Sequence, residues 1–190
     1  MAKIHHLSPA AHGRLVEEYY DLTTRGRIEI ADAIERAREL GDLKENGDYH
    51  AAKDQQGLME ARIGTLKAIL DNASLVLRAS ERDDIKAQLA AKNLPEHHQE
   101  FLEQAFDDHK LVDGQEVNLR TIVTILYDGD DESDAERFLI GHTEEQSEHT
   151  IITPDSPIGK ELIGRNVDDW VEYQGPRGSL KVHVRHVEPA

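Results

Sequence analysis

A series of mostly apolar residues between positions 49 and 73 constrains the fold of this 190-residue chain more than any other feature. The positions alternate in steps of three and four, which is the spacing of a coiled-coil seam, and Gln56 is the polar exception. The series is Tyr49, Ala52, Gln56, Met59, Ile63, Leu66, Leu70 and Ala73. This spacing predicts one long helix that packs along a second helix.

The segment before this series supplies the partner helix. Ser8 is a good N-cap, and Pro9 suits the first helical position because a residue there needs no backbone N–H. Residues 23–26 are poor helix formers, so we expect bending or fraying there. Two helices joined by a short turn form an antiparallel hairpin, in which each helix is roughly 40 Å long. Its apolar positions recur about every 3.5 residues at Leu15, Tyr19, Leu22, Ile30, Ile34 and Ala37.

Three acidic residues, Asp42, Glu45 and Asp48, lie in the turn of this predicted hairpin. Exposed carboxylates are ionised at neutral pH and are good ligands for Mg²⁺. Three are too few to hold the ion alone, because Mg²⁺ keeps several waters and combines one or two protein carboxylates with phosphate oxygens. The acids would then form half of a site in which the ion activates water beside a phosphodiester. The alternative interpretation is that they only cap the helix and keep the turn soluble.

The charge of the chain is unevenly distributed. The formal net charge is −16, but residues 1–78 carry 11 basic and 13 acidic side chains, whereas residues 121–190 carry 6 and 15. Autonomous binding to DNA needs a field of the opposite sign, so we expect a protein partner instead. The chain contains no cysteine, which excludes disulfides and thiolate metal sites. It also lacks a run of about 20 apolar residues, and we expect a cytoplasmic protein without membrane contact.

Residues 79–118 have a different pattern. Residues 83–91 and 96–110 predict two short helices, which we interpret as a helical connector. His97, His98 and His109 invite a hypothesis of metal binding or pH sensing. Their spacing matches no defined ligand set, so solvated surface histidines are the favoured interpretation.

From residue 119 onward the apolar period changes to two. Strands are predicted at residues 119–126, 136–140 and 150–153, and residues 170–184 predict a hairpin with its turn at 175–178. Ser156 and Pro157 begin a short helix that Gly164 closes. This region predicts a compact α+β domain with no nucleophile–base pair, P-loop or dinucleotide fingerprint.

Two motifs stand out in these segments. The first comprises Gly41-Asp42-Leu43-Lys44-Glu45-Asn46, Tyr49-His50-Ala51-Ala52 and Gln55-Gln56-Gly57. The second is Asp155-Ser156-Pro157-Ile158 through Leu162-Ile163-Gly164. Both resemble motifs of a known family, the bacterial GreA/GreB-type transcript-cleavage factors; the first is long and specific, and the second is moderately so. The resemblance covers both ends of the chain but not residues 79–118.

The resemblance implies a coiled-coil domain at residues 1–78, the connector at 79–118 and an FKBP-like domain at 119–190. The globular domain would dock on the rim of the RNA polymerase secondary channel, through Asp155, Ser156, Pro157 and Ile158, while the hairpin enters the channel. The chain would not be an enzyme by itself and would hold no stable cofactor.

The tip residues acquire roles from the same resemblance. Asp42 and Glu45 would share a Mg²⁺ ion with polymerase and donate their carboxylates in trans, so that backtracked nascent RNA is cleaved near its 3′ end. Asn46, Asp48 and Tyr49 would support the tip. Arg38 and Lys53 would meet the RNA phosphates.

Two alternatives remain. Some relatives enter the same channel and inhibit polymerase without cleavage. A joint altered by the long segment 79–118 would favour that function, whereas the two tip carboxylates Asp42 and Glu45 argue for cleavage. A stand-alone prolyl isomerase or coiled-coil adaptor is the weakest alternative, because a long rod with a charged tip would then be idle.

Overall fold

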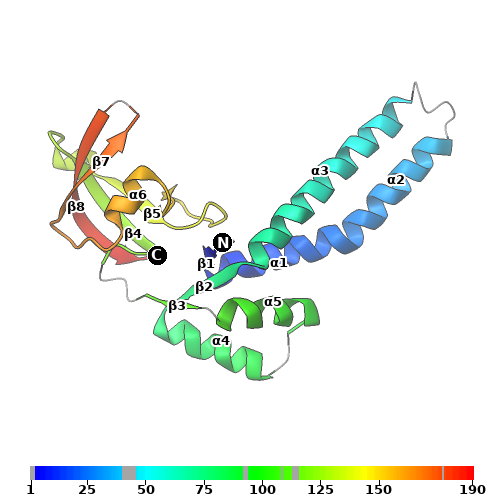
Figure 1. The fold of residues 1–190 in the computed structure, drawn as a ribbon, viewed down its shortest axis with the longest axis horizontal. Coiled ribbons are helices and arrows are strands. Elements are labelled where there is room, and N and C mark those ends of the chain that lie inside the picture. The colour runs from blue at the N-terminus through cyan, green and yellow to red at the C-terminus, as the bar shows by residue number, and fades with distance from the viewer. Residues whose placement is uncertain (1–2, 40–45, 92–93, 108, 113–115, 177) are drawn as a thin grey trace.

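Two helical segments run side by side and project from the rest of the molecule as an antiparallel arm (Figure 1). The computed structural model describes residues 3–39, 46–91, 94–107, 109–112, 116–176 and 178–190. The first side of the arm is α1 (Pro9–Asp21), the π-helical turn η1 (Leu22–Gly26) and α2 (Arg27–Glu39). The second side is α3 (Gly47–Leu70). The predicted helical hairpin is confirmed.

The predicted irregularity in the first helix is the π-helical turn η1. The Thr23 and Thr24 hydroxyls donate hydrogen bonds to the backbone carbonyls of Tyr19 (2.7 Å) and Tyr20 (2.6 Å). A Cβ on Gly26 would lie 3.2 Å from the Met59 sulfur, so the absence of a side chain lets α3 approach closely. The N-cap prediction is also confirmed, because Ser8 Oγ accepts a hydrogen bond from the backbone N–H of Ala11 at 3.0 Å.

The heptad prediction is wrong at its last position. Helix α3 ends at Leu70, and Ala73 begins strand β2 (Ala73–Leu77), all five residues of which are buried. Strand β2 pairs in parallel with β1 (His5–Leu7) on one side and with β3 (Lys110–Leu111) on the other. The pattern of a short run of buried apolar residues does not distinguish a helix from a strand, and this small sheet was therefore not predicted.

The two predicted connector helices are present as α4 (Ala79–Ala91) and α5 (Glu96–Asp107). Helix α5 ends before Lys110, which belongs to β3 instead of the predicted helix. The domain boundaries predicted at residues 78 and 118 stay predictions.

The side chains of α5 share one hydrophobic core with β1, β2, α4 and the adjoining parts of α1 and α3, and we call this region the base of the arm. This core contains Leu7, Ala11, Leu15, Val16, Leu66, Ile69, Leu70, Ala73, Leu75, Leu77, Ile85, Leu102 and Ala105.

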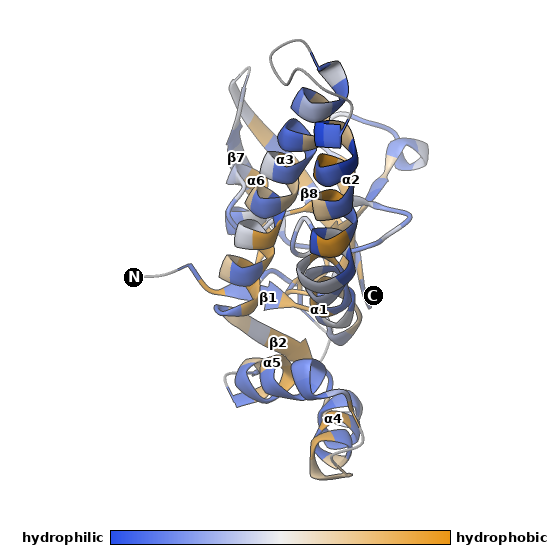
Figure 2. Ribbon diagram, turned by 90° about the vertical axis from the view of Figure 1, so that its right-hand side faces the viewer, coloured by the Kyte–Doolittle hydropathy of each residue, from blue (hydrophilic) through white to orange (hydrophobic). Residues whose placement is uncertain are grey.

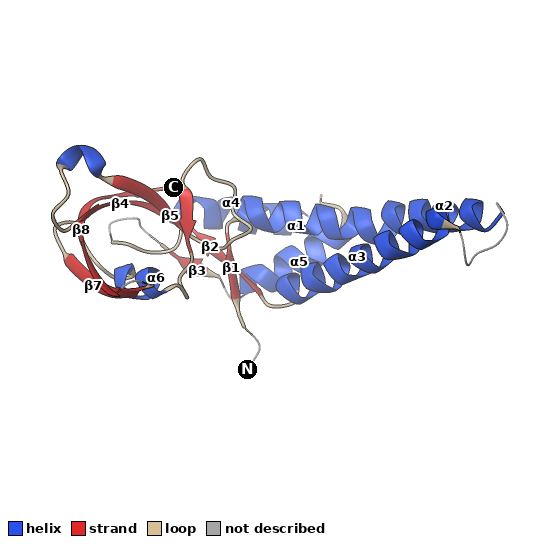
Figure 3. Ribbon diagram, turned by 90° about the horizontal axis from the view of Figure 1, so that it is seen from above, coloured by secondary structure: helices blue, strands red, loops and turns tan. Residues whose placement is uncertain are grey.

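The C-terminal domain is built on a five-stranded sheet in the order β6-β5-β4-β8-β7. All neighbouring strands are antiparallel except β5 and β6, and a short helix lies against β7, as expected of an FKBP-like α+β domain (Figure 1). Figure 3 shows the strands of this domain at one end of the molecule, together with α6, and the helical arm at the other. The elements are β4 (Thr121–Tyr127), η2 (Glu132–Asp134), β5 (Glu136–Ile140), β6 (Thr150–Ile152), α6 (Pro157–Leu162), β7 (Trp170–Gly175) and β8 (Gly178–Pro189).

Polar contacts join the sheet domain to the base of the arm. Glu145 accepts hydrogen bonds from the backbone N–H (2.8 Å) and hydroxyl (2.7 Å) of Ser8. Arg14 donates to the carbonyl of Glu144 at 3.0 Å, and the Glu144 carboxylate lies 3.4 Å from Arg62. These contacts all reach the loop between β5 and β6. They fix the direction in which the arm leaves the domain.

A second connection runs through the connector. Arg120 donates to both carboxylate oxygens of Glu81, at 2.6 and 3.0 Å, and to the carbonyl of Val76 at 3.0 Å. Arg120 has a positive φ of 61°, which few non-glycine residues adopt. The joint between the two parts of the molecule is therefore held from two sides. None of the described helices is both long and apolar enough to cross a bilayer.

Candidate functional site

The tip of the arm is the candidate functional site, and the structure describes its frame, by which we mean the end of α2 and the start of α3. Asp42 and Glu45, the predicted metal ligands, lie outside the described residues. Helix α2 ends at Glu39 and α3 begins at Gly47, so the two acids belong to the segment between them. In Figure 2, hydrophilic residues cover much of α2 and α3. The frame of the site thus stands on a polar rod at the far end from the sheet domain (Figure 1).

Asn46 ties the two helices together at the tip. Its Oδ1 accepts a hydrogen bond from the backbone N–H of Tyr49 at 3.1 Å and caps α3. Its Nδ2 donates to the carbonyl of Ala37, in the last turn of α2, at 2.6 Å. One side chain therefore links both ends of the segment that carries Asp42 and Glu45. The role that the resemblance implies for Asn46 in support of the tip stays a prediction, and its contact with α2 was not predicted.

Tyr49, Arg38 and Lys53 gather on one side of the tip. The guanidinium carbon of Arg38 lies 5.8 Å from the centre of the half-buried Tyr49 ring, within the range of a cation–π contact. Lys53 is one turn after Tyr49 on the same helix face, and its ammonium donates to Gln56 at 2.5 Å. The structure therefore places Arg38 over the Tyr49 ring and Lys53 one helical turn further along α3.

Asp48 lies on a different face from Tyr49. It is exposed in the first turn of α3 and lines a shallow groove of about 290 Å³ between α2 and α3, together with Arg36 and Gln55. A carboxylate in this position is favoured by the partial positive charge of a helix N-terminus. The position explains Asp48 as a helix-start residue, and its predicted support of the metal site stays a prediction.

The predicted docking motif divides into exposed and structural residues. Ser156 Oγ donates to the carbonyl of Thr153 at 2.7 Å and accepts from the backbone N–H of Gly159 at 3.1 Å, so it caps α6. Ile158 packs against the core of the sheet domain. Asp155 and Pro157 are exposed. A partner at this surface would therefore meet Asp155 and Pro157 most directly.

Sequence reasoning missed the contacts that place this motif beside the base of the arm. Lys3 lies 2.6 Å from Asp155 and holds the pKa of that carboxyl below its ordinary value by its hydrogen bond and charge. His5 Nδ1 lies 2.9 Å from His142 Nε2, and burial lowers the pKa of both imidazoles. A cavity of about 460 Å³ lies between these groups, lined by residues that include His6 and Thr153. These pairs are more than 130 positions apart in the sequence, and no local pattern indicates them.

Comparisons with known proteins agree with both motifs. Residues 5–75 match the family described as "Transcription elongation factor, N-terminal", and residues 112–189 match "Transcription elongation factor, GreA/GreB, C-term". Transcription elongation factor GreA of Roseiflexus sp. (strain RS-1) is 30% identical over 183 residues, with 96% of each chain covered. GreA of Rhodococcus erythropolis is 35% identical over 187 residues, covering 96% of this chain and 93% of that protein. Among solved structures, GreA factor homolog 1 of Thermus thermophilus is 20% identical, with a TM-score of 0.37, and covers 98% of this chain and 99% of that one.

Proposed function

The chain belongs to the GreA/GreB family of transcription elongation factors, and on that premise we propose that it stimulates cleavage of backtracked RNA inside RNA polymerase. The observation that carries the proposal is the polar arm, whose described end frames Asp42 and Glu45 (Figures 1 and 2). The arm would enter the secondary channel of polymerase and bring these carboxylates to its active centre. A polymerase partner also implies a cytoplasmic location.

Asp42 and Glu45 fit a shared Mg²⁺ ion by the chemistry of their donors. Carboxylate oxygens are the ligands that Mg²⁺ prefers, and two of them leave the remaining positions for water, RNA phosphate and polymerase side chains. When bound, the ion would polarise the phosphodiester and lower the pKa of the attacking water. The factor would then contribute ligands in trans and have no reaction of its own.

The other tip residues would orient the RNA. Arg38, beside the Tyr49 ring, and Lys53, one helical turn after it, carry positive charge that attracts phosphates, while the Tyr49 ring offers a surface on which a base can stack. Asn46 would hold both ends of the acidic segment in place through its bonds to Ala37 and Tyr49. Because residues 1–78 are nearly neutral, the arm can approach RNA with less repulsion than the acidic sheet domain.

The test uses stalled, backtracked elongation complexes with labelled RNA. Addition of the full chain with Mg²⁺ should release short 3′ fragments, and the double variant Asp42→Asn/Glu45→Gln should release none while it still binds polymerase. Asp32→Asn/Glu35→Gln is the matched control, because both residues are exposed on α2 and their replacement removes the same two charges away from the turn. Binding without fragments from the unaltered chain would overturn the proposal.

A second candidate function is inhibition of polymerase by occupation of the same channel. The observation that favours it is the connector, because α4 and α5 pack into the base of the arm and Glu81 pairs with Arg120 at the joint. If this joint holds the arm at a different angle to the sheet domain, the arm would block nucleotide entry without bringing Asp42 and Glu45 to the polymerase active centre. Slower RNA synthesis without fragments would support this function over cleavage.

Docking offers an independent check on either function. Pro157 is exposed beside Asp155, so Pro157→Glu adds charge at the expected contact with the channel rim. This variant should weaken polymerase binding while saturating amounts restore the original effect. Unchanged binding would remove this surface from the interface.

A further inference from the structure

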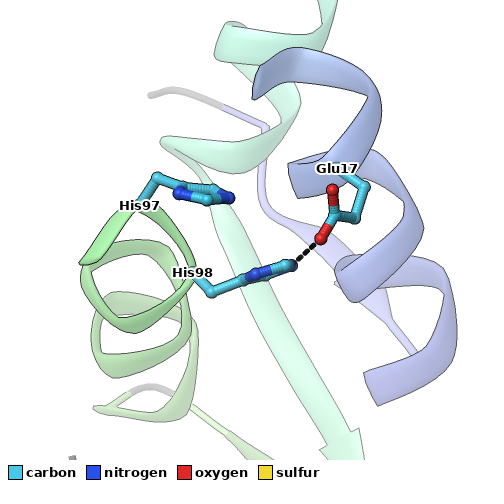
Figure 4. Close-up of side chains that lie close together, drawn as sticks. All are labelled: Glu17, His97 and His98. Carbon is cyan, nitrogen blue, oxygen red and sulfur yellow. Dashed lines mark ion pairs between the residues drawn. The ribbon is translucent and has the colours of Figure 1, made fainter. Parts of the chain in front are cut away.

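Three potential metal ligands meet where helix α5 packs against α1 (Figure 4). Glu17 comes from α1, and His97 and His98 come from the first turn of α5. One potential ligand atom from each residue lies within 4.8 Å of the other two. His98 Nε2 lies 3.5 Å from Glu17 Oε1. Glu17 is 80 positions before His97, so this cluster exists only in the folded chain.

The two imidazoles are held in place by stacking. The His97 ring stacks on Tyr20 with a centroid distance of 3.7 Å and an interplanar angle of 7°. The His98 ring lies 4.8 Å from the His97 ring, although consecutive residues on a helix do not normally face each other. Both rings turn toward α1 in Figure 4. Rings with fixed orientation lose little conformational entropy when they bind an ion.

His97 also has a buried nitrogen without a hydrogen bond. Its Nε2 is shielded from solvent and has no hydrogen-bond partner in the described part of the chain. Buried polar atoms nearly always have a partner, so this nitrogen calls for an explanation. A metal ion bound to this nitrogen would satisfy it. Glu17, by contrast, is 63% exposed and its side chain has room to move toward the two rings.

We propose that Glu17, His97 and His98 form a binding site for a divalent transition-metal ion, with Zn²⁺ as the best match. Two imidazoles and one carboxylate are a known ligand set for zinc, whereas Mg²⁺ and Ca²⁺ prefer oxygen alone. Zinc–ligand bonds of about 2.0–2.1 Å place neighbouring ligand atoms about 3.4 Å apart in a tetrahedron. The His98–Glu17 pair, at 3.5 Å, is already at that spacing, and all three ligand atoms lie within 4.8 Å of one another.

The surrounding charge favours a cation. Glu96 and Glu100 flank the two histidines on α5 and are exposed, and the segment 79–120 carries twice as many acidic as basic side chains. Because the three ligands come from two elements, bound zinc would cross-link the connector to the base of the arm. Binding to the folded state alone would raise the melting temperature of the full chain. The site is independent of the acids at the tip.

The experiment measures zinc binding to the full chain after treatment with a chelator. Isothermal titration with ZnCl₂ alone should show one site, and Co²⁺ substituted for Zn²⁺ should give the visible absorption bands of a tetrahedral site. His98→Gln and Glu17→Gln should each weaken zinc binding by at least about tenfold and remove its effect on the melting temperature. His50→Gln is the matched control, because His50 is exposed on α3 near the tip.

The variants also separate the outcomes. Glu17 is exposed, so Glu17→Gln should keep the metal-free melting temperature. This variant therefore tests the zinc site even if His98→Gln destabilises the fold. Equal zinc affinity for the original chain, Glu17→Gln and His50→Gln would mean surface binding only and would overturn the proposal. The absence of cobalt bands in the original chain would overturn it as well. Neither result depends on RNA polymerase.

Discussion

The base of the arm and its distal half share helix α3 but differ in how many apolar side chains they bury. At the base, Leu7, Leu66, Leu70 and Leu75 are fully buried and come from β1, α3 and β2. On the rest of the described arm, the buried apolar side chains are smaller or fewer, namely Ile34, Ala37, Ala52 and Ile63. A pair of helices has only one shared face, so the outer residues of a two-helix rod stay in water. Stability therefore resides mainly at the base, and the distal half remains available for a partner.

The largest expected effect tests this contrast with one leucine from each region. Leu66 is 0% exposed at the base, whereas Leu58 is 74% exposed on the distal half of the same helix. Leu66→Ala should lower the free energy of unfolding by about 3 kcal/mol, because it leaves a cavity among packed side chains. Leu58→Ala should change it by less than about 0.5 kcal/mol. Urea denaturation followed by circular dichroism measures both, and equal losses would contradict the contrast.

A smaller effect is expected at the joint between the base and the sheet domain. The Glu81 carboxylate accepts two hydrogen bonds from Arg120 and one from the backbone N–H of Arg78 at 2.9 Å. Glu81→Gln should cost about 1–3 kcal/mol, because it weakens hydrogen bonds to a partly buried charged group. Asp83→Asn is the control, since that side chain is 75% exposed on the same helix. A loss as small as that of the control would mean that the pair does not hold the joint.

The same carboxyl predicts a pH dependence. Burial alone would raise the pKa of Glu81, but its hydrogen bonds from Arg120 and Arg78 and their charges lower it below the ordinary value of 4.5. The folded state therefore favours the ionised form, and its contribution is present above pH 4.5 and lost as the pH falls through the lower folded pKa. The stability difference between the original chain and Glu81→Gln should be constant from neutral pH to about pH 5 and shrink in more acidic solution. Denaturation curves at several pH values measure it.

The sequence predicted those helix caps, turns and strands that depend on residues close together in the chain. The caps at Ser8 and Ser156, the irregular turn at residues 23–26 and the strand at residues 136–140 all follow from short-range spacing and residue type. The small parallel sheet was missed, because its three strands come from residues 5–7, 73–77 and 110–111 and only tertiary contacts bring them together. Parallel pairing leaves no turn signal between neighbours.

The contacts of the site residues also divide into those with sequence neighbours and those with residues far away in the chain. Asn46 accepts a hydrogen bond from the backbone N–H of Tyr49, and Glu81 accepts one from the backbone N–H of Arg78, each three positions away; both are local contacts typical of a helix start, although neither was predicted from the sequence. Their second partners, the carbonyl of Ala37 and the guanidinium of Arg120, are not indicated by any local pattern. Asp42 and Glu45 were identified by a motif, and their geometry lies outside the described residues. Motifs therefore named the chemistry, while packing decides which side chains support it.

The smallest expected effect on stability lies at the distal end. Asn46→Ala removes the cap of α3 and the bond to Ala37, which should cost about 1 kcal/mol of local stability. Because few side chains are buried nearby, the loss should appear as faster amide exchange in the first turn of α3 more than as a lower global melting temperature. Hydrogen exchange with mass spectrometry measures the two regions separately.

Asn46→Asp separates the two bonds of this side chain. A carboxylate still accepts the hydrogen bond from Tyr49 but cannot donate to the carbonyl of Ala37. Exchange in the first turn of α3 should therefore stay slow in Asn46→Asp, while the last turn of α2 exchanges faster because its link across the tip is lost. If both variants leave both turns unchanged, Asn46 does not hold the ends of the acidic segment. The tip would then depend on contacts formed with a partner, and the contrast with the self-supporting base would be sharper still.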